Sequence, residues 1–211
     1  MNKLISNDRQ NFLEKARNLP LQVSEEQLEK CDLYVENLLK WQKKINLIGP
    51  ATVKEPYTRH VLDAAQIVQH VPRGTILDVG SGAGIPGLVW SIFMSNPIYL
   101  CERIVKKASF LSDTTRKLSL GKNHHIIADD VANVIEQFDI ITGRAVTNIS
   151  EFLHLTQHCA HKDTLYILPK GKDFEKELNG ALDEWRFDVD IKKSIVQDTS
   201  KICFLNNIQG R

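Results

Sequence analysis

The stretch DVGSGAGIPG, residues Asp78–Gly87, is the strongest indication of fold class in this 211-residue chain. It begins at the end of the short apolar run Thr75–Val79, which is typical of a buried parallel strand, and it ends at the start of a helical segment, Pro86–Met94. Four glycines in eight residues are more than a structural turn requires. Because α/β folds bind ligands where their strands end, this stretch predicts a ligand-binding loop.

Strand-like and helical segments alternate after this loop. Strands are predicted at Ile98–Cys101, His125–Ala128, Phe138–Thr142 and Thr164–Leu168. Helices are predicted at Val105–Leu118, Ile149–Cys159 and Asp173–Trp185, and further strand-like runs at Phe187–Val196 and Ile202–Ile208. This alternation predicts a doubly wound α/β sheet with helices on both faces.

The segment before the loop is helical. Ser24 and Gln27 form a capping-box signature, and apolar residues then recur at helical spacing as far as about Trp41. A second helix is predicted over roughly Glu55–Val71. We therefore divide the chain into a helical N-terminal extension, residues 1–73, and an α/β domain, residues 74–211.

Composition and charge exclude several protein classes. The chain has 27 Lys and Arg against 26 Asp and Glu, and 42% of its residues are hydrophobic, so it is neither disordered nor fibrous. No apolar run approaches the roughly 18 residues that span a bilayer. The four cysteines are far apart and show neither pairing nor metal-ligand spacing. We expect a cytoplasmic monomer that has no bound metal and does not associate with a membrane.

Two cofactor classes fit the glycine loop. Gly82, Gly84 and Gly87 match the dinucleotide fingerprint of nicotinamide-dependent oxidoreductases, but that fingerprint begins directly at the end of a strand, which here is Gly80. The register that starts from Asp78, acidic-x-Gly-x-Gly-x-Gly, is similar to the S-adenosylmethionine loop of class I methyltransferases. Glu102, at the end of the next strand, can accept hydrogen bonds from ribose hydroxyls of either cofactor. The register therefore favours S-adenosylmethionine.

Further motifs have the same order and spacing as those of one family. They are Trp41 with Asn46–Ile48, Arg59–Asp63, the glycine loop, Phe138–Val146, and the pair Lys170–Gly171. With them the chain resembles the bacterial 16S rRNA guanine-N7 methyltransferases of the RsmG family, also called glucose-inhibited division protein B. The resemblance spans residues 45–171. It implies a Rossmann-like class I methyltransferase fold with a helical N-terminal extension, and it implies 16S rRNA or a 30S particle as substrate.

The resemblance also implies which residues bind S-adenosylmethionine. Contacts are expected at Asp78, Gly80, Gly82, Gly84, Ile85, Glu102, Val131, Ala132 and Arg144. Asp130–Asn133 departs from the family's adenine segment, and Thr199–Ile202 lacks its Glu-Arg-His run. Two alternatives therefore stay open: a class I methyltransferase with another substrate, and a non-catalytic S-adenosylmethionine-binding module.

Arg144 is the residue expected to act directly in the reaction. A guanidinium can donate hydrogen bonds to the cofactor carboxylate, to a phosphate or to guanine O6. The alternative is a salt bridge to Asp78 or Asp63. Guanine N7 carries a lone pair and no proton, so its methylation needs no general base. The residues expected to contact RNA are Arg59, His60, Lys106, Lys107 and Lys170.

Overall fold

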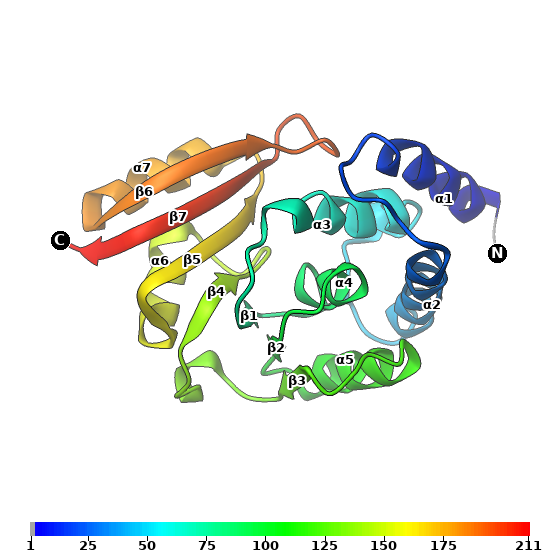
Figure 1. Ribbon diagram of the computed structural model, residues 1–211, viewed down its shortest axis with the longest axis horizontal. Helices are drawn as coiled ribbons and strands as arrows, with labels where there is room; N and C mark the ends of the chain where they lie inside the picture. The colour runs from blue at the N-terminus through cyan, green and yellow to red at the C-terminus, as the bar shows by residue number, and fades with distance from the viewer. Residues whose placement is uncertain (1–2) are drawn as a thin grey trace.

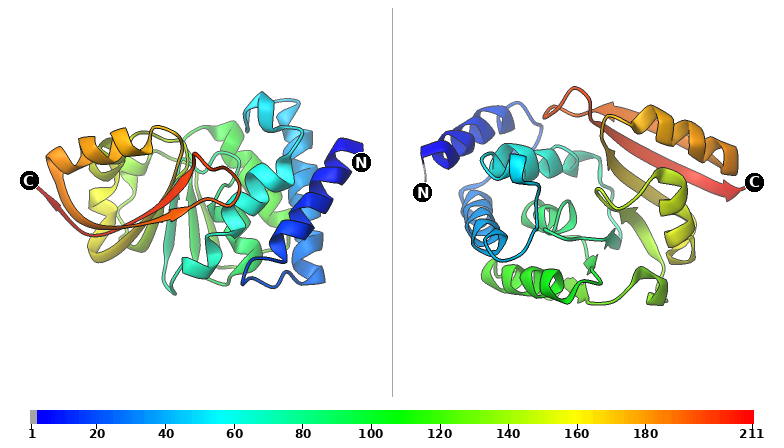
Figure 2. Two further views of the ribbon diagram at one scale, coloured as in Figure 1. Left: turned by 90° about the horizontal axis from the view of Figure 1, so that it is seen from above. Right: turned by 180° about the vertical axis from the view of Figure 1, so that it is seen from behind.

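The computed structural model describes residues 3–211, which form one seven-stranded sheet with helices on both faces (Figures 1 and 2). The strand order is β3-β2-β1-β4-β5-β7-β6. The bounds are β1 (Ile76–Val79), β2 (Ile98–Cys101), β3 (His124–Ile127), β4 (Phe138–Thr142), β5 (Ala160–Lys170), β6 (Trp185–Lys193) and β7 (Lys201–Gly210). Strands β1 to β5 run parallel, and β7 runs antiparallel to β5 and β6.

The predicted α/β fold is confirmed. Strands β2 and β4 have the predicted bounds, because apolar residues predominate in both and all are buried except the half-buried Tyr99, while Asp139 of β4 is exposed. The sequence left the direction of the last two strands open. Residues 194–200 alone join β6 to β7, and so short a connection makes the pair antiparallel.

Two hydrophobic clusters cover the two faces of the sheet. Successive strand residues point to opposite sides, so Ile76 and Ile140 face one cluster while Leu77 and Ile141 face the other. The first cluster includes side chains of α4 (Gly87–Phe93) and α5 (Val105–Lys117). The second includes side chains of α6 (Ile149–Thr156) and α7 (Phe174–Glu184).

The N-terminal extension packs on the first face, outside α4 and α5 (Figure 1). It contains α1 (Lys3–Ala16) and α2 (Glu25–Gln42), and the capping box at Ser24 and Gln27 is present, with backbone-to-side-chain distances of 3.2 and 3.0 Å. The hydroxyl of Tyr34 on α2 donates to the carbonyl oxygen of Ala83 in the glycine loop at 2.9 Å. The extension thus shares its core with the sheet, and the boundary after residue 73 stays a prediction.

The predicted helix over residues 55–71 is divided into three turns. They are a π-helical turn, Tyr57–Leu62, then α3 (Asp63–Ala65) and the 3-10 turn Val68–His70. Asp8 on α1 caps the first of them, accepting from the backbone nitrogens of Tyr57 at 2.7 Å and Thr58 at 3.2 Å. No helix among residues 3–211 combines the length and apolar character needed to cross a membrane.

Candidate cofactor and substrate site

The glycine loop between β1 and α4 adopts the conformation that its glycines permit. Gly80, Gly82 and Gly84 have φ angles of +65°, +52° and +76°, in the left-handed region that side chains disfavour. The backbone nitrogen of Gly82 donates to Oε2 of Glu102 at 2.9 Å, which ties the loop to the end of β2. A Cβ on Gly84 would lie 2.5 Å from Cβ of Leu88, so this glycine lets α4 pack against the loop.

Two cavities meet at this loop. The first, here called the arginine cavity, measures about 500 Å³ and is lined by Arg144, His60 and Gly82 among others. The second, the glutamate cavity, measures about 570 Å³ and is lined by Glu102 and Val131 among others. Gly80 and Thr147 line both. Volumes of this size suit small-molecule ligands, and the shared lining allows one ligand to occupy both cavities.

The glutamate cavity combines carboxylates with apolar side chains. Glu102 is 5% exposed, and its Oε1 accepts from the backbone nitrogen of Ile104 at 2.8 Å. Each carboxylate oxygen has two acceptor sites, so Glu102 can hold its backbone donors and still accept from a ligand hydroxyl. Val131 begins the 3-10 turn Val131–Asn133, which Asp130 caps by accepting from the Ala132 nitrogen at 3.1 Å. Ala132 itself lines neither cavity.

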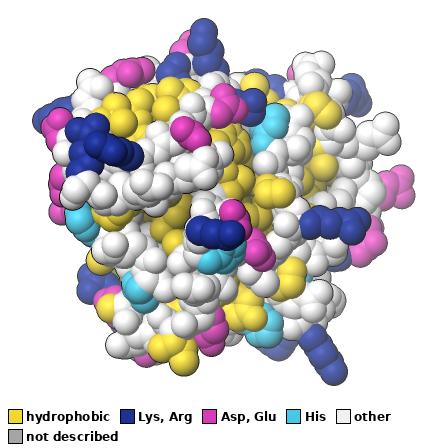
Figure 3. Space-filling model, turned by 60° about the vertical axis from the view of Figure 1, so that its left-hand side comes forward, with side chains coloured by type: hydrophobic (Ala, Val, Ile, Leu, Met, Phe, Trp, Pro, Cys, Tyr) yellow, Lys and Arg dark blue, Asp and Glu magenta, His cyan; other side chains and the backbone are white. Residues whose placement is uncertain are grey.

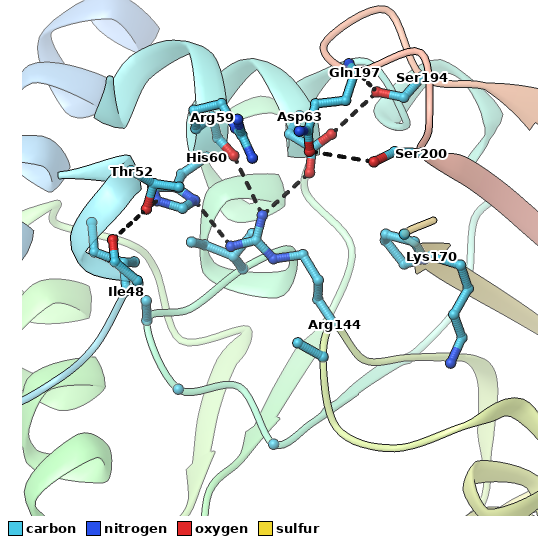
Figure 4. A pocket seen from close by; sticks show the side chains of 18 of the residues that line it. Ile48, Thr52, Arg59, His60, Asp63, Arg144, Lys170, Ser194, Gln197 and Ser200 are labelled. Carbon is cyan, nitrogen blue, oxygen red and sulfur yellow. Dashed lines mark hydrogen bonds and ion pairs between the residues drawn. The ribbon is translucent and has the colours of Figure 1, made fainter. Parts of the chain in front are cut away.

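Arg144 follows β4 and points toward residues 59–63 (Figure 4). Its Nη1 lies 3.2 Å from Oδ2 of Asp63 and 3.4 Å from the carbonyl oxygen of Arg59. Its Nη2 lies 3.0 Å from Nδ1 of His60. Of the two salt bridges considered from the sequence, the structure contains the one to Asp63. The next residue, Ala145, has a φ of +58°, a strained value of the kind found where a loop shapes a functional site.

Asp78 lies outside both cavities, although the sequence places it among the cofactor contacts. Its side chain is fully buried, and Oδ2 accepts from the backbone nitrogen of Gly87 at 3.0 Å. Oδ1 has no hydrogen-bond partner among residues 3–211. Burial raises the pKa of this carboxyl group to about 7. Asp78 therefore holds the start of α4 against the glycine loop, and its predicted cofactor contact stays a prediction.

The predicted RNA-contacting residues have different surroundings. Arg59, His60, Lys107 and Lys170 line the arginine cavity, and Lys106 does not. The side chain of Lys170 is only 9% exposed, and its Nζ lies 2.8 Å from both the carbonyl oxygen of Thr147 and Oε2 of Glu177. Lys170 therefore links the loop after β4 to α7.

Several residues of the arginine cavity were not predicted. Oγ1 of Thr52 lies 2.9 Å from Nε2 of His60. The loop between β6 and β7 and the start of β7 contribute Ser194, Gln197, Ser200 and Lys201. Ser194 contacts Asp63, with its Oγ 3.4 Å from Oδ1. The only sequence signal for this loop is its position between two strands, because its residues depart from the family motif.

The histidines near Cys159 do not assemble a metal site. Nε2 of His154 lies 3.0 Å from Oε2 of Glu184, and Nε2 of His158 lies 3.1 Å from the carbonyl oxygen of Val131. Within residues 3–211, no group of three or more His, Cys, Asp or Glu side chains could hold a metal ion.

The comparison with known proteins identifies one family. The model of the family described as rRNA small subunit methyltransferase G matches residues 27–204. Ribosomal RNA small subunit methyltransferase G of Methylorubrum extorquens (strain PA1) is 37% identical over 88% of this chain and 91% of its own length. The protein of that name from Rickettsia prowazekii (strain Madrid E) is 33% identical over 89% and 98%.

Solved structures share the fold. A SAM-dependent methyltransferase from Aquifex aeolicus superposes with a TM-score of 0.56 at 14% identity, covering 81% of this chain and 96% of its own. At that identity the likeness concerns the fold alone. The family model, in contrast, covers most of the chain, including the glycine loop, Arg144 and the segment 59–63. The chain belongs to the rRNA small subunit methyltransferase G family.

Proposed function

We propose that this chain transfers a methyl group from S-adenosylmethionine to N7 of one guanine in 16S rRNA, either as free RNA or within a 30S particle. The observation that carries the proposal is the pair of cavities joined at Gly80, one rich in carboxylates and one holding Arg144, in a chain of this family. Family membership favours S-adenosylmethionine over the nicotinamide cofactor that Gly82, Gly84 and Gly87 also allow.

The lining of the two cavities fits the two ends of S-adenosylmethionine. In the glutamate cavity, Glu102 would accept hydrogen bonds from ribose hydroxyls, and the 3-10 turn Val131–Asn133 would flank the adenine. In the arginine cavity, the guanidinium of Arg144 would attract the cofactor carboxylate or an RNA phosphate. Gly80 and Gly82, which lack side chains, let the cofactor approach the backbone between them.

Positioning is the main task of the chain in this reaction. Bound S-adenosylmethionine supplies an electrophilic methyl group, and guanine N7 already has a free lone pair, so the protein needs no general base. The walls of the two cavities orient the reactants and exclude water. Orientation of this kind can lower a barrier by roughly 7–11 kcal/mol.

Three cations on the arginine cavity are available for RNA. Arg59, Lys107 and Lys201 line it, and none of them forms an ion pair within residues 3–211. In the strand register Lys201 lies opposite Lys170 and Lys193, an arrangement of like charges that an anionic ligand would relieve. On the face shown in Figure 3, acidic and basic side chains are interspersed. At the arginine cavity we propose phosphate contacts by these three cations.

Replacing Lys107 or Lys201 by alanine should weaken rRNA binding several-fold. Each substitution should also lower the slope of log affinity against log salt concentration by about 1, since each lysine displaces about one counterion. Filter binding from 50 to 300 mM salt measures both quantities. Lys162→Ala, an exposed lysine near the opposite end of β5, is the matched control. A salt slope equal to that of the control would remove Lys107 or Lys201 from the RNA interface.

Gly80→Ala should lower the affinity for S-adenosylmethionine at least tenfold. The new Cβ would lie 2.9 Å from Cγ2 of Val146, at the junction of the cavities, and the φ of +65° costs a non-glycine residue about 1–2 kcal/mol. Isothermal titration calorimetry gives the affinity, and circular dichroism reports whether the fold is kept. Gly121→Ala is the control, because its Cβ would meet nothing within 4 Å. Wild-type affinity in Gly80→Ala would place the cofactor elsewhere.

Transfer of labelled methyl from S-adenosylmethionine to unmethylated 16S rRNA tests the function. Free rRNA and 30S particles are offered separately, and chemical cleavage at 7-methylguanosine locates the product. One labelled guanine confirms cofactor, substrate and atom together. Cofactor binding without transfer to either RNA would favour the non-catalytic module, and label at another position or on another molecule would favour a methyltransferase of different specificity.

We also propose that the chain acts as a monomer in the cytoplasm. All four cysteines are buried and unpaired, which suits a reducing compartment. Light scattering at working concentration checks the oligomeric state.

A further inference from the structure

His60 differs in its contacts from Arg59, Lys107 and Lys201, the cations of the arginine cavity that form no ion pair within residues 3–211. It is 4% exposed, and both of its ring nitrogens have protein partners. Nδ1 lies 3.0 Å from Nη2 of Arg144, and Nε2 lies 2.9 Å from Oγ1 of Thr52. Because neither nitrogen is left over, His60 has no polar ring atom to offer to RNA.

The partners of His60 determine where its proton is. A guanidinium only donates hydrogen bonds, so Nδ1 accepts from Arg144 and carries no proton. The proton of the neutral ring is then on Nε2, which donates to the Thr52 hydroxyl. That hydroxyl donates in turn to the carbonyl oxygen of Gly49 at 2.9 Å. Burial, followed by the positive charges of Arg144 and Arg59, lowers the pKa of His60 to about 3, so the ring is neutral at physiological pH.

This chain of hydrogen bonds ends on the guanidinium of Arg144, as Figure 4 shows. Asp63 holds Nη1 of the same group, while Nε forms no hydrogen bond within residues 3–211. A neutral acceptor orients the guanidinium without adding negative charge, whereas a second carboxylate beside Asp63 would make the group net negative and repel an anion. The imidazole therefore keeps Arg144 both fixed and able to attract an anion.

We propose that His60 is a positioning residue for methyl transfer: it is a neutral hydrogen-bond acceptor, fixed by Thr52, that orients Arg144 in the arginine cavity. This inference rests on the proposed function, which assigns Arg144 to the cofactor carboxylate or to RNA. It requires that His60 act through Arg144 and not by touching the substrate.

A double-mutant cycle tests that requirement. At S-adenosylmethionine and rRNA concentrations below their KM values, His60→Ala should lower the rate of methyl transfer about tenfold, as expected for one charge-assisted hydrogen bond. In an Arg144→Ala background the same substitution should have no further effect. His60→Asn should restore most of the activity, because its carbonyl oxygen can accept from Arg144. Equal fold-losses in both backgrounds, or no rescue by asparagine, would overturn the proposal.

Two further measurements keep the test independent of folding and of the reaction. If His60→Ala does not fold, Thr52→Val takes its place in the cycle, since it removes only the hydroxyl that fixes Nε2. Nitrogen-15 NMR of labelled histidine in the wild-type chain should show a proton on Nε2 and none on Nδ1 from pH 5 to pH 8. A proton on Nδ1, or titration in that range, would overturn the inference. A wild-type chain that methylates no rRNA but shows the expected tautomer would instead contradict the proposed function.

Discussion

Arg144→Ala is expected to lower methyl transfer to 16S rRNA at least tenfold while leaving the chain folded. The guanidinium is the cationic group that the loop after β4 presents to the arginine cavity, and Asp63 and His60 hold it in place. The side chains of Arg144 and Asp63 are 24% and 21% exposed, so water can still reach Asp63 when the ion pair is removed, and the loss of stability should not unfold the chain. Methyl transfer, cofactor affinity and thermal unfolding are measured on the same preparation.

The ligand that Arg144 binds can be inferred from whether Arg144→Ala changes the dissociation constant for S-adenosylmethionine or the KM for rRNA. If the guanidinium binds the cofactor carboxylate, the dissociation constant for S-adenosylmethionine rises. If it binds RNA, that constant stays the same and the KM for rRNA rises. Arg116→Ala is the matched control, because Arg116 also pairs with a carboxylate, Asp113, at 2.8 Å but lines neither cavity. Wild-type turnover in Arg144→Ala would leave its salt bridge with Asp63 as its only role.

Elements whose signals lie among neighbouring residues of the chain could be predicted from the sequence. The bounds of β2 and β4 and the capping box of α2 depend on residues that are neighbours along the chain. The helix α1 gives a weaker signal, because its buried face includes Asp8, a polar residue that ordinarily marks an exposed position. Asp8 is satisfied by backbone nitrogens 49 and 50 residues away, and no local pattern indicates such a partner.

Prediction of the candidate site from the sequence has the same limit. The glycine loop and Glu102 are predictable because both lie where a strand ends. The choice between Asp63 and Asp78 as partner of Arg144 is not, because Asp63 is 81 residues away in the chain and only packing brings it close. Lys170 carries a charge that suggests a surface position, yet Glu177 and Thr147 hold it at 9% exposure.

Asp78→Asn is expected to remove a large pH dependence of stability. Asp78 is fully buried with one oxygen unpartnered, and burial raises its pKa to about 7, whereas an unfolded carboxyl group has a pKa of about 4. The native state therefore binds this proton more tightly than the unfolded state. Below about pH 4 both states are protonated and no stability is lost. Between about pH 4 and pH 7 the unfolded state releases the proton first, so the free energy of unfolding falls as pH rises.

The size of this effect makes the substitution a sharp test. Three pKa units correspond to about 4 kcal/mol, all of it lost by pH 8. Asparagine has no proton to release, so the unfolding free energy of Asp78→Asn minus that of the wild type should increase by a few kcal/mol from pH 4 to pH 8. Urea denaturation without cofactor measures this difference, in which the pH-dependent contributions of the other titrating groups cancel.

A second carboxylate supplies a control of opposite sign. Burial acts to raise the pKa of Asp113, but hydrogen bonds from Lys117 and Trp41 outweigh it and hold that pKa well below its usual range. The carboxylate of Asp113 thus stabilises the native state above about pH 4, and that contribution is lost as pH falls further. Asp113→Asn should therefore lose stability relative to the wild type as pH rises, where Asp78→Asn gains it. A difference for Asp78→Asn that does not change with pH would mean that burial does not disfavour its charge, and that the start of α4 is held by an ionised carboxylate.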